Sequence, residues 1–136
     1  MTEPDDLPAH LTTLQSALAR LRDALEQPKT EWTRDAAIQR FEFCFELAWK
    51  TVARAARREG VECVSPRRAF RTAMKLGWVP DDTIWLDMLD DRNRTSHTYD
   101  ETTAEQIFSH LAQYLTALSA LTQRLRSVAE PSEPAN

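Results

Sequence analysis

The sequence predicts an all-α fold, an up-and-down bundle of about five helices. Two leucine-rich seams, within residues 7–25 and 107–128, alternate spacings of four and three residues. That spacing is typical of long helices packed nearly antiparallel or parallel to one another. The two glycines and seven prolines do not interrupt the interior of the apolar periodic segments, so they mark the boundaries of helices. No segment shows the alternation expected of a half-buried β-strand.

The first expected helix carries the first leucine seam and stops before Pro28. A second helix follows and ends at Gly60. It has an apolar stripe at helical spacing that is expected to face the core. The stripe consists of Ile38, Phe41, Phe45, Ala48 and Val52.

Three shorter signals delimit the remaining helices. Ser65-Pro66 combines an N-cap residue with proline at the first helical position, and Gly77 closes that helix as a C′ glycine would. The segment 80–82, Pro-Asp-Asp, opens a fourth helix. Asp100 or Thr102 caps a fifth, which carries the second leucine seam.

The second helix is apolar on more than one side. At about 100° per residue, Phe43 and Leu47 point away from the stripe that faces the core. Such a helix is either central in its own bundle or also buried against another chain. A fringe of Arg40, Lys50 and Arg54 favours the second explanation, because protein interfaces carry a polar rim.

Length and composition predict one domain over residues 1–130 and a disordered, proline-broken tail over 131–136. The acidic start lacks the features of a secretory signal, and no apolar run is long enough to span a bilayer. We therefore expect a cytoplasmic protein without membrane contact. Cys44 and Cys63 are far apart and belong to no metal-like cluster, so free thiols and no bound metal are expected.

Charge is distributed unevenly along the chain. The net charge is −4, which argues against nonspecific affinity for nucleic acid over the whole surface. Residues 50–78, however, hold eight basic residues against two acidic ones, so this segment carries +6 and the rest of the chain −10. This basic segment either attracts a polyanion or an acidic partner, or merely solvates helix faces.

Residues 91–100, DRNRTSHTYD, differ from the helix formers on either side of them. Asparagine, threonine, serine and aspartate favour caps and turns over helix interiors. We expect one helix to stop near Asn93 and the next to begin near Asp100, with an extended connector between them.

A break in the helix changes what Arg92 and His97 can do together. In an unbroken helix, five residues correspond to a rotation of about 140°, which would send these side chains in different directions. With a break between them they can converge, and His97 and Tyr99 share a side of an extended connector. Imidazole exchanges protons near neutral pH, and guanidinium matches phosphate oxygens. The pair suits attack on a phosphodiester, although one histidine per chain is few for both acid and base. The alternative is a capping segment without chemistry.

The motif resembles that of a known family. Arg92, His97 and Tyr99 are similar to the R-x4-H-x-Y signature of HEPN-domain toxins. The strings MLDDRNRTSHTYDE and RFEFCFELAWKTV resemble the branch called nucleotidyltransferase substrate-binding proteins. The resemblance runs from about Leu11 to Leu125.

This resemblance implies a helical bundle that dimerises through the helices bearing the motif, so that two copies of Arg92 and His97 share one cleft. It implies a metal-independent endoribonuclease that needs no cofactor and leaves 2′,3′-cyclic phosphate ends on RNA. Its expected partner is a minimal nucleotidyltransferase (MNT) antitoxin that transfers AMP to the motif tyrosine, here Tyr99. Asn93 is then a supporting residue, and Glu46 a candidate for the same role. The alternatives are a non-catalytic adaptor for the nucleotidyltransferase and a plain dimerisation module.

Overall fold

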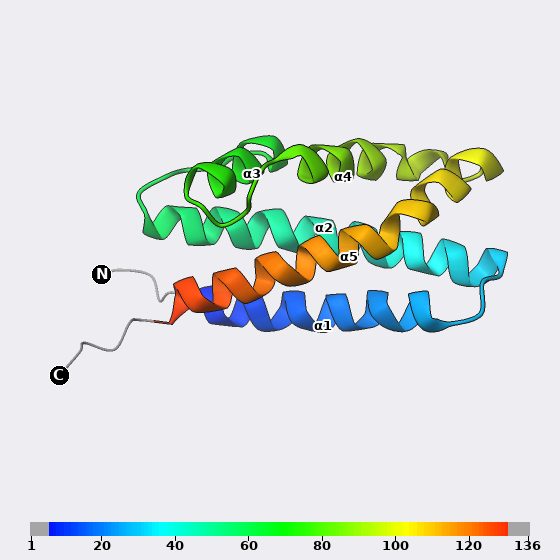
Figure 1. Ribbon diagram of the computed structural model, residues 1–136, viewed down its shortest axis with the longest axis horizontal. Coiled ribbons are helices and arrows are strands. Elements are labelled where there is room, and N and C mark those ends of the chain that lie inside the picture. The colour runs from blue at the N-terminus through cyan, green and yellow to red at the C-terminus, as the bar shows by residue number, and fades with distance from the viewer. Residues whose placement is uncertain (1–5, 131–136) are drawn as a thin grey trace.

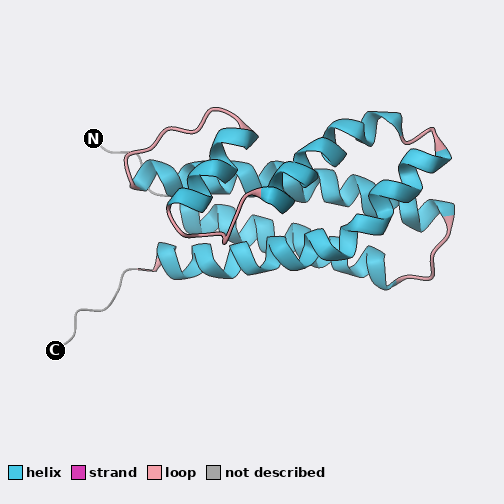
Figure 2. Ribbon diagram, turned by 45° about the horizontal axis from the view of Figure 1, so that its top comes forward, coloured by secondary structure: helices cyan, strands magenta, loops and turns pink. Residues whose placement is uncertain are grey.

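The computed structural model describes residues 6–130, so the predicted tail at 131–136 lies outside the described residues. Within them the chain forms five α-helices and one short 3-10 helix, with no strand (Figure 2). The helices are α1 (Leu7–Glu26), α2 (Glu31–Arg58), α3 (Pro66–Lys75), α4 (Thr83–Arg94), the 3-10 helix η1 (Thr95–His97) and α5 (Glu101–Ala129). The predicted all-α fold is confirmed.

The helices run up and down, and α3 and α4 follow each other along one edge of the bundle (Figure 1). α1, α2 and α5 are the three long helices, and α2 contacts every other helix. The chain reverses direction between α4 and α5 at one end of the molecule. The sequence motif lies at this reversal.

The predicted helix boundaries agree with the local chemistry. Gly60 and Gly77 have φ of 80° and 77°, the left-handed conformation that favours glycine after a helix. The Ser65 hydroxyl accepts a hydrogen bond from the Arg68 amide, and Asp100 rather than Thr102 caps α5.

The start of α2 was not predicted. There the side chains of Thr30 and Thr33 each accept the other's backbone N–H, at 3.1 and 2.8 Å. This reciprocal capping satisfies two amides that the first helical turn leaves without partners.

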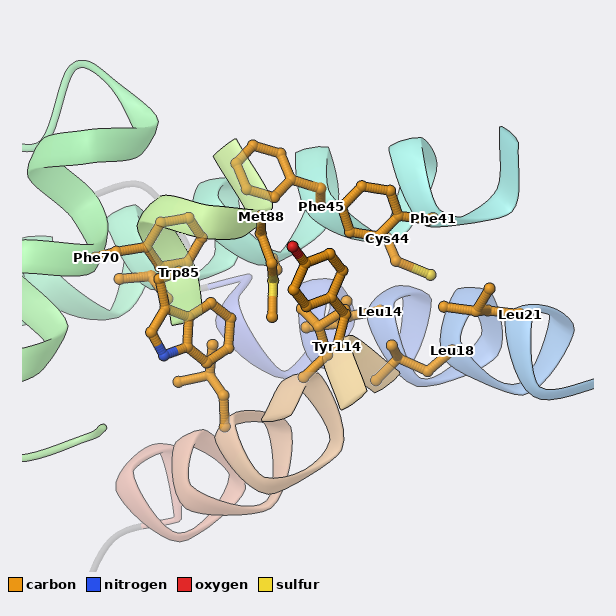
Figure 3. Close-up of a cluster of buried hydrophobic side chains, with 14 of the residues drawn as sticks. Leu14, Leu18, Leu21, Phe41, Cys44, Phe45, Phe70, Trp85, Met88 and Tyr114 are labelled. Atoms are coloured by element: carbon orange, nitrogen blue, oxygen red, sulfur yellow. The ribbon is translucent and has the colours of Figure 1, made fainter. Parts of the chain in front are cut away.

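The core is aromatic at its centre and leucine-rich along α1 (Figure 3). Tyr114 of α5 stacks on Phe41 of α2 with ring centroids 5.3 Å apart, and Phe70 stacks on Trp85 at 4.8 Å. Burial of each such ring contributes roughly 2–3 kcal/mol. The apolar stripe predicted for α2 is buried throughout. No helix within residues 6–130 is long and apolar enough to cross a membrane.

Candidate functional site

The connector between α4 and α5 is not extended, so this prediction from the sequence is wrong. The chain continues from α4 into η1, and Thr98 is also helical in backbone conformation. Side-chain hydrogen bonds tighten the segment, because the Thr95 hydroxyl donates to the Arg92 carbonyl at 2.7 Å and that of Thr98 to the Thr95 carbonyl at 3.3 Å. Threonine thus replaces the lost helical hydrogen bonds with local ones, and Arg92 and His97 are held on a compact junction.

His97 and Tyr99 lie side by side despite this correction. The Tyr99 hydroxyl is 3.4 Å from Nδ1 of His97, and the two rings meet edge to face with centroids 5.9 Å apart. Both side chains are exposed, and Tyr99 is 83% exposed. The phenol and the imidazole are therefore both accessible from solvent.

Arg92 is held by Glu46 of α2. Nη2 of Arg92 donates to Oε1 of Glu46, and Nη1 lies 3.5 Å from Oδ1 of Asn93. The second carboxylate oxygen of Glu46 accepts the Trp49 indole N–H at 3.1 Å and lies 4.0 Å from the Lys50 ammonium. Glu46 therefore orients the guanidinium of Arg92, a contact that the sequence alone did not predict.

Arg92 and His97 are not directly bonded to each other. Within residues 6–130 no hydrogen bond or ion pair joins them, although both α4 and η1 contact α2. The structure thus places Arg92, Asn93, His97 and Tyr99 on one junction, with Glu46 bonded to Arg92. It contains no group of three or more His, Cys, Asp or Glu residues arranged to hold a metal ion among the described residues.

A buried carboxylate beside Arg92 was missed by the sequence analysis. Asp91 is 4% exposed and accepts hydrogen bonds from Tyr114 at 2.6 Å, His110 at 2.7 Å and Arg94 at 3.2 Å. Burial, together with the hydrogen bond to Asp91, raises the pKa of Tyr114 above its ordinary value, so the phenol stays protonated and acts as a donor. These contacts tie the last turn of α4, which carries Arg92, to α5. The signal in the sequence was an aspartate on the apolar side of a helix.

A second network fixes the start of α5. Arg34 of α2 is 3% exposed and donates to Glu101 at 2.6 and 3.3 Å and to Glu105 at 3.1 Å. The hydrogen bond from Arg34 lowers the pKa of Glu101, and bonds from Lys29 and then Arg34 lower that of Glu105. The Asp91 network thus holds the end of α4 before the junction, and the Arg34 network holds the start of α5 after it. The sequence alone contains no signal for the Arg34 network, because Glu101 and Glu105 lie 67 and 71 residues away from Arg34 along the chain.

The second apolar face of α2 remains uncovered by the rest of the described chain. Phe43 is 57% exposed even though α2 is central in the bundle, so the central-helix explanation does not account for it. Phe43 and Leu47 line a largely apolar groove of about 440 Å³ between α1 and α2. Arg20 and Arg40 also line this groove. Of the charged fringe predicted around Phe43, only Arg40 lines this groove, because Lys50 and Arg54 line a separate hollow. Arg20 of α1 was not predicted.

The five-helix bundle, with an Arg-x4-His-x-Tyr segment at the reversal between its last two helices, defines an HEPN-like helical protein. The chain belongs to the nucleotidyltransferase substrate binding protein like family, whose model matches residues 9–127.

The similar proteins agree with this family. A Haemophilus influenzae protein named "Probable ribonuclease HepT" is 32% identical over 95 residues, which are 66% of this chain and 65% of that protein. The match thus spans slightly less than two thirds of the relative's length. A crystal structure of a Thermus thermophilus protein is 39% identical with a TM-score of 0.79, covering 83% of this chain and 98% of that one. The structure of HI0074 from Haemophilus influenzae, described as the fold of a substrate binding domain of a nucleotidyltransferase, is 28% identical with a TM-score of 0.68. It covers 88% of this chain and 96% of that one.

Proposed function

We propose that this chain is a ribonuclease toxin of a toxin–antitoxin pair, with a nucleotidyltransferase as its antitoxin. The observation that carries this proposal is the α4–α5 junction, where Glu46 orients Arg92 and an exposed His97 follows beside Tyr99. Similarity to a protein named as a probable ribonuclease supports the activity. The family description supports the nucleotidyltransferase partner.

The proposed reaction needs a proton acceptor, a proton donor and a positive charge. His97 removes the proton from a ribose 2′-hydroxyl, whose oxygen attacks the adjacent phosphorus. The P–O bond to the next nucleotide's 5′-oxygen breaks, and that oxygen takes up a proton, leaving a 2′,3′-cyclic phosphate. Glu46 and Asn93 contact only part of the five-donor guanidinium of Arg92, so its other N–H groups remain for the phosphoryl oxygens. No step requires a metal ion.

A second copy of the chain would supply the second proton-transfer group. We propose that the exposed face with Phe43 and Leu47 forms the homodimer interface, which brings two copies of His97 into one cleft. The support is the uncovered Phe43 and the apolar groove beside it, since apolar residues with a charged rim are typical of interface cores.

Tyr99 is the proposed site of regulation by AMP transfer from the antitoxin. Its hydroxyl is exposed and lies 3.4 Å from the His97 ring. Attaching AMP there would add bulk and a negative phosphate where the RNA phosphate must approach. Steric block and like-charge repulsion would then act together to prevent cleavage.

A non-catalytic adaptor is the second candidate function. It is favoured by the family description and by the description of the HI0074 structure, both of which refer to substrate binding. The two functions share the fold and the partner, and they differ in whether Arg92 and His97 perform chemistry.

RNA cleavage by purified variants distinguishes the two. His97→Ala and Arg92→Ala should each lower the cleavage rate by about 10²- to 10⁴-fold with unchanged circular dichroism, and cleavage by the wild type should persist in EDTA. Arg92→Lys should also be poorly active, because an ammonium cannot make the bidentate contact. Arg124→Ala, at an exposed arginine of α5, is the matched control and should cleave normally. Full activity of His97→Ala, or a requirement for added metal, would favour the adaptor.

Tyr99→Phe separates regulation from catalysis. This variant should cleave RNA like the wild type but gain no AMP when incubated with the nucleotidyltransferase, ATP and magnesium. Intact-mass measurement and peptide mapping of the wild type should place the added AMP on Tyr99. AMP on another residue, or an inactive Tyr99→Phe protein in the absence of any partner, would contradict the assigned role.

A further inference from the structure

A surface hollow lies where α1, α2 and the loop after α2 meet, and its lining includes Trp49, which is hydrogen-bonded to Glu46. Its volume of about 200 Å³ is several times the roughly 30 Å³ that one water occupies in the liquid. Lys50, Arg54 and Arg57, from consecutive turns of α2, provide its positive charge, and they outnumber the one carboxylate in its lining, that of Glu62. Nothing in the predicted chemistry of the motif uses this hollow.

The hollow is joined to Arg92 through a single side chain. One carboxylate oxygen of Glu46 accepts from Arg92, and the other accepts the Trp49 indole N–H and faces the Lys50 ammonium at 4.0 Å. Trp49 and Lys50 both line the hollow. From Glu46 to Arg57, α2 advances by about 16 Å, so the basic surface continues away from the junction over a length of a few nucleotides.

Part of the positive charge in the hollow is not neutralised within the protein. Arg54 is paired with Asp6 at 3.0 Å, and Asp6 also contacts His10. By contrast, Lys50 is exposed and only distantly paired, and Arg57 is exposed without an ion pair among residues 6–130. These two cations are therefore free to meet an external anion.

We propose that this hollow binds a phosphate of the RNA strand beyond the one held at Arg92, so that single-stranded RNA follows α2 from Arg92 towards Arg57. The inference rests on the proposed ribonuclease function and names the path of its substrate. Lys50 and Arg57 contact the backbone phosphates, and the Trp49 ring lies beside them. Cationic side chains interleaved with an aromatic ring are how single strands are bound without regard to base sequence.

An acidic protein surface would use the same cations, but RNA fits the structure better. Through Trp49 and Glu46 the hollow is connected to the Arg92 guanidinium, whose geometry matches phosphate, and a substrate longer than one nucleotide must leave the junction along some surface. Three of the eight basic residues in the segment 50–78, Lys50, Arg54 and Arg57, line the hollow and provide positive charge along α2.

Binding of RNA to a catalytically inert protein tests this path. In a His97→Ala background, the double change Lys50→Gln with Arg57→Gln is compared with Arg22→Gln and Arg124→Gln. The control removes the same charge from exposed arginines that do not line the hollow. Anisotropy of a labelled 12-nucleotide single-stranded RNA is measured at several salt concentrations.

The hollow variant should bind about tenfold more weakly than its parent, and the control should bind within about twofold of it. Loss of two phosphate contacts should also change how binding depends on salt. The plot of the logarithm of the RNA association constant against the logarithm of the salt concentration should have a slope shallower by about 1.4, because each contact to single-stranded nucleic acid contributes about 0.7. A purely structural role of these side chains would not change that slope selectively.

Equal weakening of RNA binding in both double variants would overturn the proposed path, and so would an unchanged salt dependence of binding in the Lys50→Gln, Arg57→Gln variant. So would normal RNA binding accompanied by loss of binding to the nucleotidyltransferase, which would assign the surface to a protein partner. Cleavage is scored separately with His97 intact. If the wild type cleaves RNA but the hollow variant binds normally, the path alone fails; if the wild type does not cleave but the binding difference holds, the ribonuclease function alone fails.

Discussion

Replacement of Asp91 by alanine tests whether the buried carboxylate beside Arg92 stabilises the α4–α5 junction. Asp91 accepts three hydrogen bonds, but the three donors differ in what their loss costs. The Tyr114 hydroxyl is buried and would be left without a partner, at about 1–3 kcal/mol. The side chains of His110 and Arg94 are 44% and 39% exposed, so water can take the place of the lost carboxylate. The loss of each of these two contacts then costs up to about 0.5 kcal/mol of stability.

Asp91→Ala should therefore lower the free energy of unfolding by about 1–4 kcal/mol. At about 4 °C per kcal/mol for a chain of this length, the melting temperature should fall by about 4–16 °C. Urea denaturation followed by circular dichroism at 222 nm measures the free energy directly. Asp90→Ala, at the exposed neighbouring aspartate, should change it by less than about 0.5 kcal/mol.

A double-mutant cycle with Tyr114→Phe shows whether the unsatisfied hydroxyl is the cause. Tyr114→Phe alone should cost about 1 kcal/mol, because the carboxylate of Asp91 keeps its two other donors. In Asp91→Ala with Tyr114→Phe the unpaired hydroxyl is gone, so the double change should cost about 1–2 kcal/mol less than the sum of the single changes. Strictly additive costs would refute the argument that a buried, unpaired phenol dominates.

Three further outcomes are expected. Phe43→Glu should convert a dimer to a monomer in light scattering while leaving the helical circular dichroism spectrum at about 25 °C unchanged, because Phe43 is exposed in the single chain; an unfolded variant would mean that this face is core. Burial raises the pKa of the Cys44 thiol to about 12, so iodoacetamide should label the partly exposed Cys63 long before Cys44 under native conditions, and equal rates would contradict the burial. The hydrogen bond from Arg34 lowers the pKa of Glu101 in the folded state, so its stabilisation is present above the ordinary pKa of about 4.3 and is lost as the pH falls through the folded value. Glu101→Gln should accordingly flatten the loss of stability between about pH 5 and 3 in acid denaturation, and an unchanged acid profile would contradict it.

Local patterns were sufficient to predict most of the fold. The leucine seams, the proline positions and the glycines at 60 and 77 depend on interactions within one helix or one turn, so the residues near each boundary determine it. The start of α2 was missed because its cap uses two threonines in place of the more familiar Ser/Thr with Glu. The connector was predicted as extended because residues that favour turns also satisfy a 3-10 helix, and only the actual hydrogen bonds of Thr95 and Thr98 distinguish the two.

The sequence by itself determined the helical bundle, the break after α4, and the identity of the motif residues Arg92, Asn93, His97 and Tyr99. Tertiary structure decided which side chains surround them. Glu46 meets Arg92 across 46 residues of chain, and Asp91 meets Tyr114 across 23. Those contacts depend on how α2, α4 and α5 pack. Helical periodicity specifies which face of each helix is buried, but not which polar groups on neighbouring helices come into register.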